Sequence, residues 1–152
     1  INKIKSYMKN KKKISSQEIL KLINLTENFE VSELIDNCLA KNNNKIINIL
    51  SENNYSPEDC IIILRTFLSK TKRMLKLAIE LEKNKDINKT INSAKPPIFW
   101  KDKEIVKVQL NKWKTKKIKE LIKNINNVEL EIKKNYNNSI LIVTNFILEK
   151  SR

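Results

Sequence analysis

The feature that most constrains the fold of this 152-residue chain is the complete absence of glycine. Without glycine the chain cannot form the glycine-rich loops that cradle phosphates in nucleotide-binding proteins. It is also poorly suited to tight β-hairpins, because their two-residue turns need positive φ angles. Histidine is absent as well, which removes the commonest general base and the commonest metal ligand. These absences favour a helical protein that is not an enzyme.

The two cysteines, Cys38 and Cys60, lie at helical positions among apolar residues. Two thiols without histidine do not make a tetrahedral zinc site, so we expect buried free thiols, no metal and no cofactor. Free thiols favour a reducing, cytoplasmic compartment. No apolar run approaches the roughly 18 residues of a membrane span, so we expect no membrane partner.

Apolar residues recur at helical spacing along most of the chain, which predicts an all-helical bundle without a sheet. Residues 1–9 are predicted to be the last turns of one helix, and residues 15–18 form a capping box that begins the next. Residues 29–31 are interpreted as a short linker, after which Ser32 caps a short helix. The clearest helix start is Ser56, which is followed by proline and two acidic residues in the first turn.

The second half of the chain predicts a loop, a long helix and a final helix. Residues 83–93 are polar and are interpreted as a loop, and the two prolines that follow impose an extended course. Asp102 is placed to begin a helix whose apolar face continues to Ile132, with a bend or break expected at 124–127. Residues 128–132 also alternate with period two, so a strand is the local alternative. A turn at 136–139 then leads into the last helix.

The net charge of +14 is concentrated in two short segments. Residues 1–13 carry six lysines and no acidic residue, and residues 95–119 carry nine lysines against two acidic residues. Clustered positive charge is typical of a protein with a polyanionic partner. The alternative is that the charge only reflects a composition saturated in lysine, asparagine and isoleucine.

Five motifs, in order from about residue 15 to the last residue, resemble the bacterial DNA polymerase III delta subunit, a component of the clamp loader. They are residues 29–36, residues 56–68, which resemble the family's P-x-x-I-L-R-x-L segment through Pro57 and Ile63-Leu64-Arg65, residues 94–101 with P-P-x-F-W-K, residues 109–113 with Q-L-x-x-W, and residues 129–136. The resemblance implies that residues 1–28 are the end of an AAA+-like lid domain. Residues 29–152 would then be the helical collar domain, and the chain a fragment of a longer protein.

The resemblance also implies partners. A delta subunit helps to open the ring-shaped sliding clamp so that the clamp can be loaded on primed DNA during replication. Its collar packs in a ring with those of the other clamp-loader subunits, so we expect an apolar face that is incompletely buried in the isolated chain. Contact with the sliding clamp would need the N-terminal module, which this chain lacks.

Two aromatic positions of the family's collar lie near the template strand, and here they correspond to Trp100 and Tyr136. We predict that these two residues together form a stacking platform for the strand. The expected phosphate contacts are the lysines around the proline-rich loop: Lys95, Lys101, Lys103 and Lys107.

Other interpretations remain open. Trp100 could instead pack on the bundle beside Phe99, and Tyr136 could be a turn residue with a hydrogen-bonded hydroxyl group. Ile98, Phe99 and Trp113 are assigned to the core. The alternatives to a clamp-loader subunit are a stand-alone basic helical nucleic-acid-binding module and a structural adaptor whose charge is compositional.

Overall fold

The computed structural model describes residues 15–152, apart from the side chains of residue 16 and residues 18–28. The predicted helix in residues 1–9 therefore lies outside the described residues. So do the side chains of Ile19, Leu22 and Ile23, which would show whether residues 1–28 pack separately. The division of the chain at residue 28 stays a prediction.

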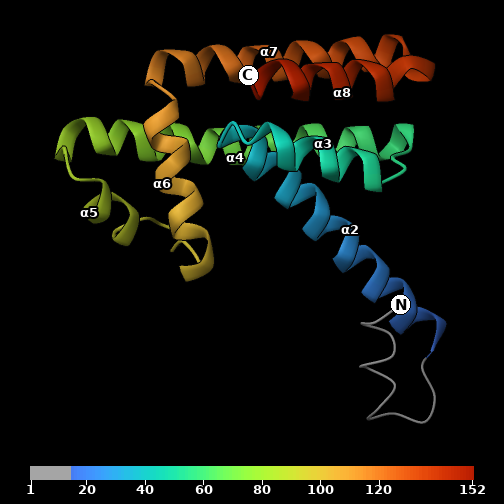
Figure 1. The fold of residues 1–152 in the computed structure, drawn as a ribbon, viewed down its shortest axis with the longest axis horizontal. Coiled ribbons are helices and arrows are strands. Elements are labelled where there is room, and N and C mark those ends of the chain that lie inside the picture. The colour runs from blue at the N-terminus through green and yellow to red at the C-terminus, as the bar shows by residue number, and fades with distance from the viewer. Residues whose placement is uncertain (1–14) are drawn as a thin grey trace.

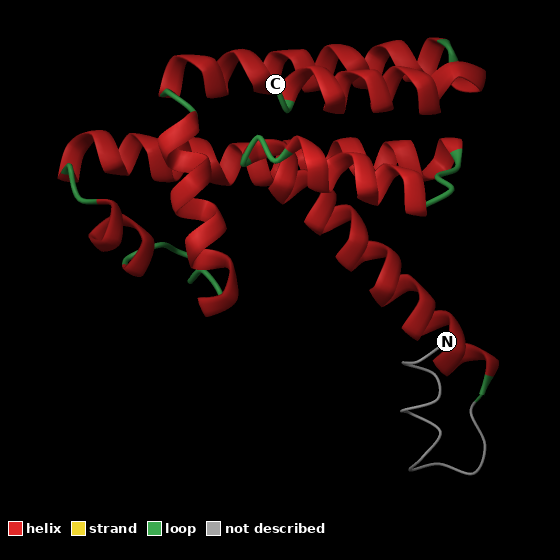
Figure 2. Cartoon of the chain, in the orientation of Figure 1, coloured by secondary structure: helices red, strands yellow, loops and turns green. Residues whose placement is uncertain are grey.

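The described residues form helices and no strand, which confirms the all-helical prediction (Figures 1 and 2). Residues 128–132, where a strand was the alternative, lie inside a helix. The α-helices are α2 (Ser16–Leu39), α3 (Asn43–Glu52), α4 (Pro57–Asn84), α5 (Ile87–Asn92), α6 (Lys103–Lys112), α7 (Thr115–Lys134) and α8 (Ser139–Lys150). Two 3-10 turns, η1 (Trp100–Asp102) and η2 (Tyr136–Asn138), precede α6 and α8. None of these helices is long and apolar enough to cross a membrane.

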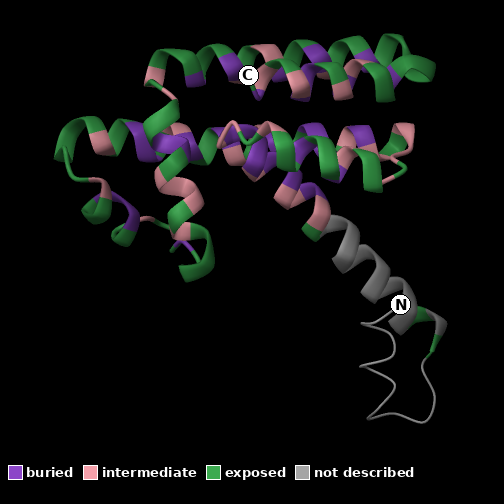
Figure 3. Ribbon diagram, in the orientation of Figure 1, coloured by how far each residue is buried: buried purple, intermediate pink, exposed green. Residues whose placement is uncertain are grey.

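Helix α4 is the centre of the bundle and contacts α2, α5, α6, α7 and α8. Helices α7 and α8 lie side by side along α4. Helix α6 runs across α4 and leads into the start of α7 (Figure 1). Buried residues gather where these helices meet (Figure 3). The largest fully buried side chains come from α2, α3, α4, α7 and α8 and include Leu34, Phe67, Leu121, Ile125 and Ile147.

The predicted linker at residues 29–31 is wrong, because α2 runs without interruption through it. No proline or glycine lies there, and extending an existing helix costs less than nucleating a new one. Ser32 accordingly lies within the helix. From Val31 onward α2 belongs to the core, where Leu34, Ile35 and Leu39 are fully buried.

Helix α4 begins as the sequence predicts. The Ser56 backbone N–H donates to the Asp59 carboxylate at 2.7 Å, and the Asp59 N–H donates to the Ser56 hydroxyl oxygen at 3.2 Å. The loop predicted after α4 is partly wrong, because residues 87–92 form the short helix α5. Its signal was Asp86, whose carboxylate accepts hydrogen bonds from the N–H groups of Asn88 and Lys89 in the first turn at 2.9 and 3.0 Å.

The expected long helix is divided at a different place from the predicted one. Residues 124–127 lie within α7, and the break falls at Trp113, where the backbone is extended. The Trp113 indole N–H donates to the Leu39 carbonyl oxygen at 2.7 Å, a contact between residues far apart in sequence. A straight helix through Trp113 would not let the apolar faces of both α6 and α7 reach the core.

The last carbonyl groups of α2 are all paired, as burial requires. Asn37 and Cys38 accept hydrogen bonds from the N–H groups of Asn42 and Lys41, with Lys41 in the left-handed conformation at φ 58°.

Helix α6 supplies partners for two more carbonyl oxygens of α2. The Asp36 oxygen accepts from the Gln109 side chain at 3.0 Å, and the Leu39 oxygen accepts from Trp113. The two polar positions of the Q-L-x-x-W motif thus fix α6 against the end of α2.

The two thiols are buried and free, as expected. Burial raises the pKa of Cys38 to about 12 and also raises the pKa of Cys60. Both groups therefore remain neutral thiols at physiological pH.

Candidate nucleic-acid interface

The proline-rich loop between α5 and η1 is anchored to α4 at two points. The Arg73 guanidinium group donates hydrogen bonds to the carbonyl oxygens of Pro96 and Pro97 at 2.9 and 3.2 Å. One residue later the side chain of Ile98 enters the core, where it is 6% exposed. The Lys95–Pro96 peptide bond is cis. The loop thus has a defined course over the surface of α4.

This anchoring leaves the next two aromatic side chains in solvent. Phe99 is 58% exposed and Trp100 is 69% exposed, with their ring centroids 5.9 Å apart. The placement of Ile98 in the core is confirmed, but the placement of Phe99 there is wrong. Ile98 is buried in the core, and the chain then turns outward into η1. Trp100 consequently packs with a tilted ring against Phe99 rather than covering the bundle.

The four predicted lysines differ in how much free charge they offer. Lys103 donates to the Asn92 side chain at 2.7 Å, and Lys107 pairs with Glu104 at 2.7 Å. Lys95 and Lys101 have no acidic partner among the described residues. The Lys101 ammonium group lies 5.3 Å from the centre of the Trp100 ring, a cation–π distance. Lys95 and Lys101 are therefore the lysines most available to a phosphate group near Trp100.

Tyr136 lies in η2 and is 46% exposed. Its hydroxyl group donates a hydrogen bond to the carboxylate of Glu58 in the first turn of α4. That hydrogen bond is the main reason why the pKa of Glu58 is lowered and the pKa of Tyr136 is raised. The geometry matches the interpretation of Tyr136 as a turn residue with a hydrogen-bonded hydroxyl group, although part of its ring stays accessible.

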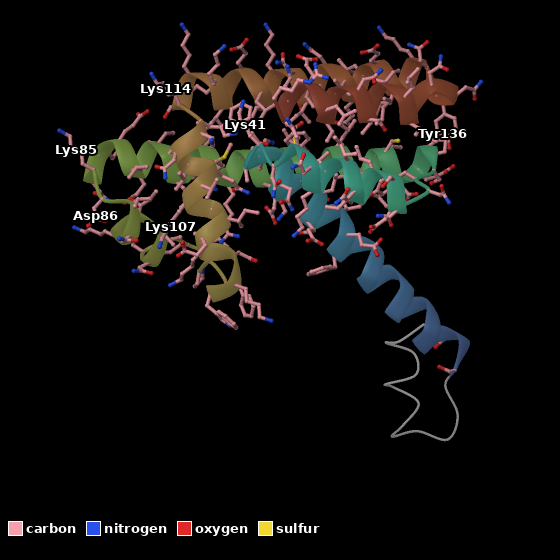
Figure 4. All side chains as sticks on the ribbon, viewed as in Figure 1. Lys41, Lys85, Asp86, Lys107, Lys114 and Tyr136 are labelled. Carbon is pink, nitrogen blue, oxygen red and sulfur yellow. The ribbon has the colours of Figure 1, made fainter. Side chains whose placement is uncertain are left out.

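The structure does not bring Trp100 and Tyr136 together. Tyr136 contacts Glu58, whereas the loop that carries Trp100 is held by Arg73, which lies about 22 Å further along α4 at 1.5 Å per residue. Figure 4 shows Tyr136 at the opposite end of the long axis from Lys107 and Lys114. The full length of α7 carries the chain away from the loop, so the predicted single platform does not form.

One cationic feature was not foreseen from the sequence. Lys112 at the end of α6 and Lys117 near the start of α7 lie in the predicted basic segment, but the sequence indicated no particular site for them. In the fold they line a hollow next to Trp113 together with Lys41 and Lys150, which come from distant parts of the sequence. No local pattern marks Lys41 or Lys150, so only the folded chain could identify this cluster.

Comparisons of the chain with protein-family models, with curated protein sequences and with solved structures find no match. Among the side chains that the structure describes, no group of three or more histidine, cysteine, aspartate or glutamate residues is placed to hold a metal ion. The site must therefore be judged from its own geometry.

Proposed function

We propose that this chain is a non-catalytic collar and scaffold region of a clamp-loader delta-type subunit, and that its proline-rich loop contacts the template strand of primed DNA. The observation that carries the proposal is the anchored loop that holds Trp100 in solvent beside Lys95 and Lys101. An unpaired base can stack on an exposed indole ring, a contact worth roughly 1–3 kcal/mol. The lysines add attraction to phosphates that does not depend on sequence.

The scaffold role is supported by apolar side chains that the chain leaves in solvent. Leu130 on α7 and Leu141 on the adjacent α8 are 58% and 63% exposed, and Ile140 is 40% exposed. Exposed apolar residues on two neighbouring helices are typical of a surface that a partner covers. A collar packed against sister subunits would bury such a surface.

The test is DNA binding by a clamp loader reconstituted with this subunit, using primed DNA that has a 5′ template overhang. Replacing Trp100 by alanine should weaken binding by roughly tenfold, since one stacked base contributes about 1–3 kcal/mol. Ile47→Ala on α3 is a matched control, because Ile47 is also exposed but lies on another helix. Unchanged binding by the Trp100 variant, with assembly intact, would remove the DNA-contact part of the proposal.

Because the structure separates the two aromatic residues, Tyr136 needs its own variants. Tyr136→Phe removes the hydrogen bond to Glu58 and keeps the ring, whereas Tyr136→Ala removes both. If the ring contacts DNA, only the alanine variant should weaken binding. Equal binding by both variants and the wild-type protein would leave Tyr136 a structural residue.

The second candidate function is a stand-alone nucleic-acid-binding module, which the net charge of +14 favours. Such a module should bind DNA tightly without partners, with an affinity that falls steeply as salt rises. The clamp-loader proposal instead expects weak binding by the isolated chain. Measuring DNA affinity at several salt concentrations, with and without the other subunits, distinguishes the two functions.

A further inference from the structure

A second cationic site lies where α2 ends and α6 turns into α7. A hollow of about 280 Å³ opens there, and its rim carries Lys41, Lys112, Lys117 and Lys150. The side chain of Trp113 forms part of its wall. This hollow is at the C-terminal end of α6, whereas the proline-rich loop is at the N-terminal end, about 15 Å away along the ten-residue helix.

Two carboxylates, those of Glu120 and Glu149, also line the hollow and compensate part of its positive charge. Lys117 pairs with Glu120 at 3.2 Å, and Lys150 pairs with Glu149 at 2.6 Å. Lys41 and Lys112 have no acidic partner among the side chains that the structure describes. The four lysines thus exceed the two glutamates by two positive charges, an excess that attracts anions.

Three contacts between residues distant in sequence, and one contact within α8, hold the walls of the hollow in place. Trp113 is fixed by its hydrogen bond to the Leu39 carbonyl oxygen at 2.7 Å. The Lys41 ammonium group lies 4.8 Å from the centre of the Trp113 ring and donates to the Arg152 carbonyl oxygen at 3.3 Å. The Lys150 side chain is only 20% exposed and lies along the Phe146 ring. Ordering these groups before a ligand arrives lowers the entropic cost of binding.

We propose that this hollow binds a phosphate-bearing anion, either a free polyphosphate or consecutive phosphates of a nucleic-acid strand. Lysine ammonium groups recognise phosphate oxygens through charge-assisted hydrogen bonds. The volume is near the lower limit for small-molecule pockets, which suits a group of two or three phosphates rather than a bulky ligand. The inference goes beyond the proposed function, because it needs neither a clamp loader nor the Trp100 loop.

The two tryptophans of the chain allow the site to be observed directly. In a ¹⁵N-labelled sample of the 152-residue chain, the indole N–H signals of Trp113 and Trp100 report on the hollow and on the loop separately. Titration with inorganic tripolyphosphate should shift the Trp113 signal in a saturable way and leave the Trp100 signal unchanged. A parallel titration with a single-stranded oligonucleotide tests the other source of phosphate.

Two matched double variants test which lysines are responsible. Lys112→Gln with Lys117→Gln removes two exposed charges at the hollow and should weaken binding by roughly tenfold. Lys119→Gln with Lys123→Gln removes two exposed charges from the same segment of the chain. At 3.6 residues per turn, Lys119 lies about 160° around α7 from Lys117, so this control pair should bind like the wild-type chain.

The outcomes separate clearly. Saturation by tripolyphosphate assigns the hollow to a small polyanion, and saturation by the oligonucleotide alone assigns it to strand phosphates. The proposal is overturned if neither ligand gives a saturable shift of Trp113. It is also overturned if both double variants lose the same affinity, because binding would then follow net charge. Neither result depends on Trp100, so failure here leaves the proposed DNA contact of the loop intact.

Discussion

Replacing Gln109 by glutamate tests how α6 is attached to α2. The Gln109 side chain is 4% exposed, and its amide group donates to the Asp36 carbonyl oxygen at 3.0 Å and to the Asp36 carboxylate at 3.3 Å. A glutamate of almost the same size loses both donors and places a second negative charge beside Asp36. The salt bridge of Asp36 with Lys70, at 2.6 Å, offsets only part of that repulsion.

The expected loss of stability follows from these contacts. Two lost hydrogen bonds cost about 0.5–1.5 kcal/mol each. Two carboxylates about 4 Å apart repel by roughly 4 kcal/mol at an effective dielectric constant of 20, before Lys70 is considered. The folded protein can reduce this repulsion by protonating the new glutamate. We therefore expect the free energy of unfolding near pH 7 to fall by about 3 kcal/mol.

The pH dependence has a definite sign. Burial and Asp36 raise the pKa of the new glutamate in the folded state above the ordinary value of about 4.3. Below that ordinary pKa both states are protonated and the penalty for ionisation vanishes. As the pH rises, the unfolded chain releases its proton first and the folded state loses stability relative to it. The difference between variant and wild type should thus shrink near pH 4.

The assay is urea unfolding followed by circular dichroism at both pH values, with Gln109→Met as the control. Methionine removes the same hydrogen bonds and adds no charge, so it should cost about 1–2 kcal/mol at either pH. The reasoning is refuted if the glutamate variant is no less stable than the methionine variant near pH 7. It is equally refuted if the gap between them does not close on acidification.

Three further predictions concern other contacts. Ser56→Ala removes the cap of α4 and should lower the free energy of unfolding by about 1 kcal/mol in denaturant titrations, whereas Ser56→Asp should restore most of the loss. Tyr136→Phe should raise the lowered pKa of Glu58 toward that of an ordinary glutamate in a carboxyl NMR titration, and an unchanged pKa would contradict the hydrogen bond. Cys38, whose pKa is about 12, should resist thiol reagents at mildly alkaline pH until denaturant unfolds the chain, and rapid modification of the native protein would contradict its burial.

Local sequence signals fixed the class of the fold and several of its details. The lack of glycine and the helical spacing of apolar residues correctly predicted helices without a sheet in the part of the chain that the structure describes. The helix start capped by Ser56 and the burial of both cysteines were also correct. These features depend on residues within one or two turns of each other, and such short-range preferences can be read along the chain.

Two of the errors involve contacts between residues distant in sequence. The break at Trp113 is fixed by a hydrogen bond to Leu39, and the outward course of Phe99 is fixed by the anchoring of the preceding residues on Arg73. The sequence contained a start signal at Asp86, but it was obscured by the polar residues around it.

The candidate sites also combine features that local sequence patterns indicate with features that depend on long-range contacts. The sequence correctly indicated an exposed segment with Trp100, Lys95 and Lys101, because prolines and charge mark such segments locally, whereas Lys103 and Lys107 lie in α6. It could not reveal that α7 carries Tyr136 to the far end of α4, or that Lys41 and Lys150 meet at Trp113. Those distances depend on which helices pack together. Helix packing is determined by the burial of apolar surface over the whole bundle, and no single segment of the sequence contains that information.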